Sequence, residues 1–524
     1  MKKYLFKITI WALAVSLILT GCAKKKEPEQ ADPGQPAEIS YFVRLSANLS
    51  GSVNSLAETE LFKELQKNTN VNIKVIHPAA GQETEQFNIL LAGGDLPDII
   101  EWDWLNAYPG GLEMALSDKK IIELNDLFDS GKAPNLKKYL SENPDIDKMV
   151  KTDSGKYYVF PFIRGDDILC VNFGITMRND WLLELGMEPP ETIDEYYEVL
   201  KAFKEKKGAA SPLVFQKNDI GGPSDAFSGA YKATRNFYQE NGKVKFGPIE
   251  PEFKEFLITM NKWYKEGLID KDFGTIDRKT VDSKVLNGQA GAFLGYPGSH
   301  MGAYLDNMKK EDPTFDLIGT KYPVLNKGDR PQMGQMNPRY SSYGSVAITT
   351  NCKNVDAAAR FLDYGYSEEG SMLYNFGIEN VSYEKGGDSY VYTDLILNNP
   401  EGLSSSQALS RYVRSNDNGP FVQKKDAVLG YYKYPQQKAA LEIWSDTDAA
   451  NYKIPTITLT PEESKEQANI LNEINTFNDE KYFQFIMGVE PLDKFDEYVA
   501  QIKAMGIDKV IEIRQTALDR YTKR

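Results

Sequence analysis

The sequence contains few of the residues on which many enzymes and metal sites depend. Only two histidines, His77 and His300, and three cysteines, Cys22, Cys170 and Cys352, occur among its 524 residues. These are too few for a Cys/His zinc site or a disulfide framework. No G-x-S-x-G, HExxH or G-x-x-x-x-G-K-[ST] motif is present, so serine hydrolase, zincin and P-loop chemistry have no support. We expect neither a metal nor a cofactor.

Positive charge is also in the minority. Lys and Arg total 61 against 75 Asp and Glu, which gives a formal net charge of -14. Binding to nucleic acid requires clustered Lys and Arg, and no basic stripe occurs beyond the first thirty residues. We therefore expect no nucleic-acid partner. The remaining composition, 41% hydrophobic and 12% aromatic, is that of a globular protein, and the length predicts two or three domains.

Long hydrophobic runs are absent except near the start of the chain. Residues 8–20 carry no charge and follow a basic beginning. This run is shorter than the roughly 20 residues of a spanning helix, and it is typical of a signal peptide, here residues 1–21. It ends in Leu19-Thr20-Gly21-Cys22, which resembles the bacterial lipobox. The resemblance implies cleavage before Cys22, acylation of that cysteine with palmitate-like chains, and an anchor on the outer face of the cell membrane.

The rest of the chain divides into a tether and a folded body. Residues 22–38 are rich in Lys, Glu, Pro and Gln, and we expect a flexible tether there. From residue 39 onward, short apolar runs alternate with amphipathic stretches, which indicates an α/β fold. Strands expected at 39–45, 71–75 and 98–100, with helices between them, predict a parallel sheet. A further strand is expected at 345–350. Residues 192–195 (TIDE) and 460–463 (TPEE) are expected to form capping boxes that start helices, and after the second one the chain is expected to be helical to its end.

Several motifs together resemble the extracellular solute-binding lipoproteins of bacterial ABC importers, in particular the large members of family 1 that include alginate-binding proteins. Besides the lipobox, they are Leu90-Leu91-Ala92-Gly93-Gly94-Asp95-Leu96-Pro97-Asp98-Ile99, Arg178-Asn179-Asp180-Trp181-Leu182, Thr192-Ile193-Asp194-Glu195-Tyr196 and Phe361-Leu362-Asp363-Tyr364. The resemblance covers nearly the whole chain. It implies an α/β, two-lobed, periplasmic-binding-protein-like clamp of type II with additional C-terminal helices.

The resemblance also implies an arrangement of lobes that are discontinuous in sequence. We expect lobe 1 at 39–172 plus 346–420, lobe 2 at 173–345, and a mostly helical part at 421–524 that packs on the lobes. Cys170 and Cys352 then both fall beside crossover strands, either near each other or as free buried thiols. Members of this subgroup often carry a calcium loop after the helix that here ends at 203–207. Residues 204–211 (KEKKGAAS) lack its spaced oxygen ligands, so we expect no calcium.

Candidate ligand residues lie at strand ends and crossovers. A sugar ring has an apolar C–H face and an equator of hydroxyls, so its cleft needs aromatic platforms and planar polar groups. The candidates are Trp102, Asp103, Trp104, Tyr108, Arg164, Asp166, Tyr296, Arg339, Tyr343 and Trp444. Core packing is the alternative for the aromatic residues, and a solvated turn is the alternative for 164–167. The acidic composition favours neutral glycans, whereas Arg164 or Arg339 could hold uronates.

These features predict a monomeric, membrane-anchored receptor that captures an oligosaccharide outside the cell and delivers it to the permease subunits of an ABC importer. No catalysis is expected. One alternative is a secreted polysaccharide-active enzyme, a lyase or hydrolase, and another is a peptide-binding receptor on the same fold. The adjacent carboxylates at 166–167 and 368–369 support an enzyme weakly, because neighbouring residues on a strand point apart, whereas a glycosidase's two carboxyls must flank one bond.

Overall fold

The computed structural model describes residues 35–49, 51–217, 219, 225–387, 389–414 and 418–524. The predicted signal peptide, Cys22 and most of the predicted tether lie outside these ranges. In the part of the chain that is described, no helix combines the length and apolarity needed to cross a membrane. The first strand, β1 (Ala37–Phe42), begins two residues earlier than the strand predicted from residue 39, because Ala37 already pairs with Val71.

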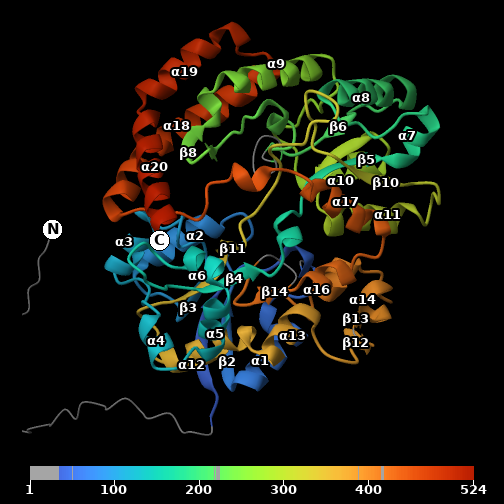
Figure 1. Cartoon of the computed structure of the whole chain (residues 1–524). Coiled ribbons are helices and arrows are strands. Elements are labelled where there is room, and N and C mark those ends of the chain that lie inside the picture. The colour runs from blue at the N-terminus through green and yellow to red at the C-terminus, as the bar shows by residue number, and fades with distance from the viewer. Residues whose placement is uncertain (1–34, 50, 218, 220–224, 388, 415–417) are drawn as a thin grey trace, which may run out of the picture.

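Lobe 1 is built on a six-stranded sheet with the order β14-β4-β11-β3-β1-β2 (Figure 1). Strand β1 pairs in parallel with β2 (Val71–Ile76) and β3 (Ile99–Glu101), which confirms the predicted parallel unit. Next to them β11 (Tyr340–Ile348) runs antiparallel between β3 and β4 (Phe160–Arg164). The other elements of this part are β14 (Val422–Gln423), α1 (Glu60–Thr69), α2 (Glu83–Gly93), α3 (Gly111–Ser117), α4 (Asn125–Asp129), α5 (Pro134–Glu142), α6 (Pro144–Val150), α12 (Val355–Asp363) and α13 (Glu368–Phe376).

Lobe 2 is built on a four-stranded sheet with the order β10-β5-β9-β6. Strand β5 (Gly174–Arg178) runs antiparallel to both β9 (Ala292–Gly295) and β10 (Leu317–Thr320). The predicted capping box at Thr192 is present and starts α8. The remaining elements are β6 (Leu213–Val214), β7 (Phe237–Glu240), β8 (Lys243–Phe246), α7 (Asn179–Leu185), α8 (Ile193–Lys207), α9 (Pro251–Lys265), α10 (Arg278–Leu286) and α11 (Ala303–Met308).

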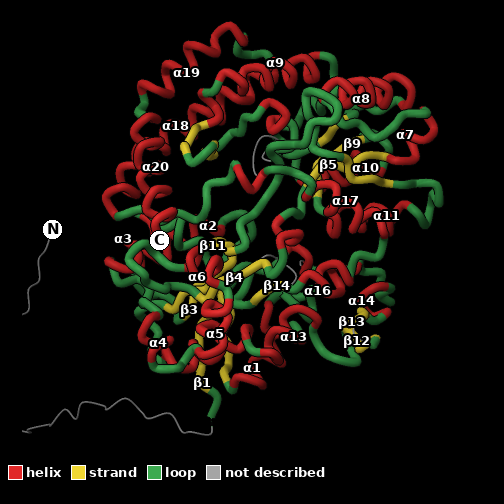
Figure 2. The backbone as a smooth tube through the Cα atoms, viewed as in Figure 1, coloured by secondary structure: helices red, strands yellow, loops and turns green. Residues whose placement is uncertain are grey.

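Each lobe has its own apolar core. Figure 2 shows the two larger sheets in separate parts of the molecule, each accompanied by helices, with loops crossing between the parts. The core of lobe 1 combines buried residues from 39–163 with residues from 340–374 and Phe421. The core of lobe 2 combines residues from 171–322 with residues from 432–510. Both lobes are therefore assembled from segments far apart in the sequence, as in a two-lobed clamp.

Two long C-terminal helices connect the lobes along one side of the molecule (Figure 1). Helix α18 (Pro461–Met487) starts from a capping box at Thr460, as predicted, and contacts both α3 of lobe 1 and α9 of lobe 2. Helix α20 (Ile507–Lys523) packs on β8 of lobe 2, while near its end Arg520 Nε donates to Asp153 of lobe 1 at 2.9 Å. The remaining helices here are α17 (Pro435–Ser445) and α19 (Phe495–Ala504).

A smaller apolar core, which we call the side subdomain, lies between residues 376 and 431. It consists of β12 (Tyr383–Gly386), β13 (Ser389–Tyr392), α14 (Asp394–Leu397), α15 (Ser405–Leu409) and α16 (Lys425–Gly430). It meets lobe 2 at the π-helical turn η6 (Pro297–Gly302). A Cβ atom on Gly298 would lie 3.1 Å from the Tyr431 hydroxyl oxygen. The two surfaces are therefore in close contact at this glycine.

Candidate functional site

A cavity of about 750 Å³ lies where the two lobes meet. Its walls come from lobe 1, from η6 of lobe 2, from the side subdomain and from the two segments that cross between the lobes. We call these the outward crossing (165–173) and the return crossing (321–339). The volume falls within the roughly 300–1,000 Å³ of small-molecule sites. Closing the lobes on a hinge at the crossings would enclose a ligand here.

Three amide side chains line the cavity from the two crossings. Asn172 lies on the outward crossing, and Gln335 and Asn337 lie on the return crossing. The backbone N–H of Asn172 donates to Gln335 Oε1 at 2.8 Å, and the backbone N–H of Asn337 donates to the Cys170 carbonyl at 2.7 Å. These bonds hold the crossings side by side. An amide carries both a donor and an acceptor, so this group suits hydroxyl-rich ligands.

Two exposed tyrosines face the cavity from opposite lobes. Tyr296 is 44% exposed and follows β9, and Tyr343 is 47% exposed and lies in β11. The register of β11 shifts between Ser341 and Val346, and such a bulge re-aims the side chains within it. The Arg44 guanidinium lies 3.8 Å from the Tyr343 ring centroid. The Tyr296 ring packs on Phe173 with centroids 4.8 Å apart, so both tyrosine rings have a protein contact and still keep nearly half of the residue exposed, as a stacking platform requires.

The charged groups at the cavity are largely paired. Arg414 Nη2 donates to Glu101 Oε1 at 2.7 Å, and both side chains are almost fully buried. Arg278 Nε donates to Asp282 Oδ1 at 2.5 Å. Burial raises the pKa of Asp219 to about 6, although a hydrogen bond from a backbone N–H and the charge of Arg278 act in the opposite direction. A carboxylate and three arginines thus share this cavity.

Three of the ten predicted ligand residues line the cavity, namely Arg164, Tyr296 and Tyr343. Arg164 is the last residue of β4 and not part of the turn that was predicted after the strand, because pairing with β14 extends β4 to this residue. Its side chain is buried, and Nη1 donates to the Pro338 carbonyl at 2.8 Å. Arg164 therefore holds the return crossing against lobe 1 at the cavity wall.

The predicted tryptophans and Tyr108 lie in the cores. Trp102 and Trp104 both pack on Phe87 of α2, with ring centroids 5.1 and 5.3 Å away. The Tyr108 hydroxyl donates to Asp118 at 2.8 Å. Trp444 lies in the core of lobe 2: it is fully buried, its Nε1 donates to the Thr320 carbonyl, and its ring covers Gly174 and Gly319. These four aromatic residues therefore pack in the cores, which is the alternative to a ligand role that the sequence left open.

The three remaining candidates stabilise turns beside the cavity. Asp103 accepts from the backbone and the side chain of Asn106. Asp166 accepts from the backbone N–H of Ile168 at 3.0 Å and caps the short 3₁₀ helix of the outward crossing. Arg339 Nε donates to the Arg164 carbonyl at 2.5 Å. None of these three side chains lines the cavity, and each has a local partner.

Sequence reasoning missed most of the cavity wall. The missed residues include the crossing amides and groups from the side subdomain: Asn172, Gln335, Asn337, Tyr392, Ser406 and Tyr431. Polar amides close to the predicted lobe boundaries at 172 and 345 were an available signal for the first three. The side subdomain gave no such signal, because its approach to η6 depends on the tertiary fold.

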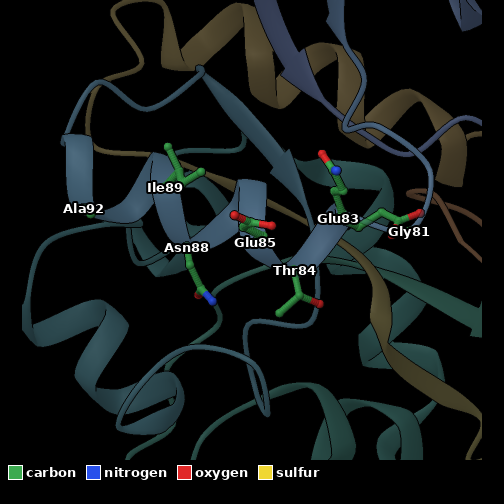
Figure 3. A pocket seen from close by; sticks show the side chains of 8 residues that line it. Gly81, Glu83, Thr84, Glu85, Asn88, Ile89 and Ala92 are labelled. Carbon is green, nitrogen blue, oxygen red and sulfur yellow. The ribbon is translucent and has the colours of Figure 1, made fainter.

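The two described cysteines and a second hollow on lobe 1 do not contribute to this site. Cys170 and Cys352 are both buried and form no disulfide bond, which is the second of the two arrangements considered. A hollow of about 620 Å³ lies along α2 on lobe 1, and all of its lining residues belong to the segment 81–92. Figure 3 shows Thr84 and Asn88 projecting from the same side of this helix. A hollow formed by one helix cannot enclose a ligand as the interlobe cavity can.

The two α/β lobes, the paired crossings and the cavity between them define a binding protein of the clamp class. The chain belongs to the bacterial extracellular solute-binding proteins, whose family model matches residues 47–372. Lipoprotein LipO of Bacillus subtilis is 27% identical over 76% of this chain and 78% of its own length. The fructooligosaccharide ABC transporter substrate-binding protein FusA of Streptococcus pneumoniae is 24% identical, over 99% of both chains.

The fold also resembles solved structures over almost its whole length. A calcium-free crystal structure of the alginate-binding protein AlgQ2 superimposes with a TM-score of 0.76 at 25% identity. The match covers 93% of this chain and 98% of AlgQ2. The additional C-terminal helices are therefore part of the architecture that the two proteins share.

Proposed function

We propose that the protein is a receptor that captures an oligosaccharide outside the cell and delivers it to the permease subunits of an ABC importer. The observation that carries the proposal is the interlobe cavity, where Tyr296 and Tyr343 offer rings from opposite lobes and the crossing amides offer hydrogen bonds. Tyrosine rings stack on the C–H faces of sugars, and amides bond their hydroxyls. FusA and AlgQ2, by their names, bind fructooligosaccharides and alginate, which supports a saccharide ligand.

Binding without catalysis is supported by the cavity lining. Among the described residues that line it, Asp219 is the only carboxylate, whereas most glycosidases use a pair. His300 has a structural environment, because the backbone N–H of Tyr296 donates to its Nδ1 at 3.1 Å. Burial and the nearby Arg278 hold the pKa of His300 well below its usual range. A neutral, buried imidazole supports the turn η6 and not an acid–base role.

The receptor is further proposed to be a monomer attached to the outer face of the cell membrane through Cys22. Residues 1–21 would be removed, and the segment from Cys22 to the start of β1 would serve as the tether. The hinge would lie in the two crossings, close to the predicted lobe boundaries at 172 and 345. Mass spectrometry of the membrane fraction tests this: a diacylated N-terminal Cys22 is expected, and a Cys22→Ser variant should lose the acyl mass and stay unprocessed.

The binding proposal is tested by calorimetry and thermal shift with oligosaccharides, short peptides and amino acids. A saccharide at 100 times its Kd should raise the free energy of unfolding by about 2.7 kcal/mol. Tyr343→Ala and Tyr296→Ala should each weaken binding about tenfold, because each removes one stacking face. Tyr197→Ala is the matched control, since Tyr197 lies on α8 outside the cavity and bonds to Glu266.

Three other outcomes would contradict the proposal. New reducing ends or unsaturated products after incubation with polymeric glycans would indicate an enzyme. A rise in Tm with peptides and no rise with sugars would indicate a peptide receptor. Equal effects of Tyr343→Ala and Tyr197→Ala would place the saccharide site elsewhere.

A further inference from the structure

The arginines that line the cavity are engaged by other groups of the protein. Three arginines line it, and two of them contact carboxylates: Arg278 contacts Asp282, and Arg414 contacts Glu101. Asp219 supplies a third negative charge. Among the described lining residues there is no lysine. Arg164 Nη1 donates to the Pro338 carbonyl, so each of the three arginines is already engaged by a group of the protein.

The paired arginines are poorly placed to accept a ligand carboxylate. The Arg414–Glu101 pair is buried in lobe 1, and the Tyr41 hydroxyl donates to the other carboxylate oxygen of Glu101 at 2.6 Å. Redirecting Arg414 to a ligand would leave Glu101 as a buried unpaired charge, which costs several kcal/mol. Arg278 is held between Asp282 and the Ser299 carbonyl, to which its Nη2 donates at 2.5 Å.

Asp219 would repel an anionic sugar directly. It lines the cavity wall on the lobe 2 side, close enough to Arg278 for their charges to interact. A second carboxylate brought into the same low-dielectric space would interact unfavourably with the ionised form. Neutral hydroxyls, in contrast, can donate to an aspartate, and charge-assisted hydrogen bonds of this kind are stronger than neutral ones.

From this charge pattern, and building on the proposed function, we infer that the cavity selects neutral oligosaccharides over uronate-containing ones and that Asp219 is a residue that determines this selectivity. The remaining polar lining agrees with a neutral ligand, because it consists of amides and hydroxyls. The polar residues of this lining include Ser46, Asn48, Asn172, Ser299, Gln335 and Asn337. The cavity thus provides hydrogen bonds and stacking faces, while its arginines are already engaged within the protein.

The test compares neutral and acidic oligosaccharides of the same length by calorimetry at pH 7. Fructo-, gluco- and galacto-oligosaccharides form the neutral set, and oligogalacturonates and alginate oligomers form the acidic set. The acidic set should bind at least about 100-fold more weakly than the tightest neutral sugar. Acidic sugars that bind as tightly as neutral ones would overturn the inference and leave the proposed function intact. Binding of no saccharide at all would overturn both.

Two further arms isolate Asp219. Asp219→Asn should weaken the binding of neutral sugars and improve the binding of acidic sugars about tenfold, while the control Asp95→Asn, at an exposed position, should change neither. In the wild type, the ratio of the affinity for neutral sugars to that for acidic sugars should fall about tenfold from pH 7 to pH 5. The reason is that Asp219 gains a proton near pH 6, while an ordinary sugar carboxylate stays ionised. This arm needs no variant.

The groups around Asp219 make that pH change specific. The Gln216 backbone N–H that donates to Asp219 does not titrate, and His300 has its pKa well below its usual range. An unchanged acidic-to-neutral ratio between pH 7 and pH 5, or an equal ratio change in Asp219→Asn, would contradict the role of Asp219.

Discussion

At the residue scale, Asp219 shows that a cavity carboxylate lowers the stability of the fold. Burial raises its pKa from the ordinary 3.8 to about 6, so the folded state binds this proton more tightly than the unfolded state. The destabilisation is fully present above pH 6 and disappears as the pH falls toward 4. It corresponds to about 3 kcal/mol at pH 7.

Asp219→Asn should therefore raise the free energy of unfolding at pH 7 by up to about 3 kcal/mol and leave it nearly unchanged at pH 4. The amide keeps the shape of the side chain and removes the charge. Urea denaturation at both pH values measures the difference, with Asp95→Asn as the exposed control. A gain of equal size at both pH values would contradict a burial effect.

The residue scale also shows why part of the site could be predicted from the sequence and part could not. Aromatic residues at strand ends identified Tyr296 and Tyr343, which line the cavity. The same pattern selected Trp104 and Trp444, which are fully buried. Local sequence does not state which partner covers a ring. For Trp444 the partners are Gly174 of β5, where a side chain would collide with the ring, and Gly319 of β10, which the ring contacts.

At the element scale, the side chains at the end of α8 disfavour the binding of a calcium ion. The helix ends at Lys207, and Gly208 follows in the left-handed conformation at φ 70°. Lys204 Nζ donates to the Glu266 carbonyl, and Lys207 Nζ pairs with Glu184. Two ammonium groups thus satisfy the oxygen atoms near this turn. A calcium ion needs six to eight oxygen ligands, and these lysines repel it.

The resulting prediction is that calcium has no role at this turn. Dialysis against EDTA should shift Tm by less than about 1 °C, and elemental analysis after dialysis should find no bound calcium. A double variant, Lys204→Ala with Lys207→Ala, removes the two ammonium groups and so controls for their repulsion of a calcium ion. A large drop in Tm on chelation, restored by added calcium, would disprove the expectation.

Elements with strong local signals were predictable, and elements set by pairing were not. The capping boxes at Thr192 and Thr460 and the parallel unit of β1, β2 and β3 agree with the sequence patterns. Strand β14 has only two residues and exists because it pairs with β4. Likewise, β11 begins at Tyr340 and not near Ser345, because its first residues pair with β4 across a bulge. Long-range pairing of this kind leaves little trace in a local pattern.

At the scale of the whole molecule, the side subdomain and η6 of lobe 2 are in contact at the cavity wall. Gly298 lies at this contact without a left-handed backbone, so a side chain is conformationally allowed there. Its Cβ would meet Tyr431 at 3.1 Å and Ser406 at 3.3 Å. A larger side chain should therefore hold the lobes apart.

We expect Gly298→Leu to weaken ligand binding about tenfold or more and to raise the radius of gyration of the ligand-saturated protein, measured by small-angle scattering. The reason is that closure contributes part of the binding free energy. Gly274→Leu is the matched control, because its Cβ would point into open space within lobe 2. Equal affinity and equal dimensions in the two variants would show that this contact does not limit closure.

The discontinuous lobes have a consequence for biogenesis. The sheet of lobe 1 gains its last strand only at residues 422–423, and the core of lobe 2 uses residues as late as Val510. A polypeptide that emerges from its N-terminus cannot complete either core until nearly all of it is available, and contacts of such long sequence separation form slowly. An exported chain with this topology would stay unfolded, and so suited to threading through a translocation channel, until most of it has crossed.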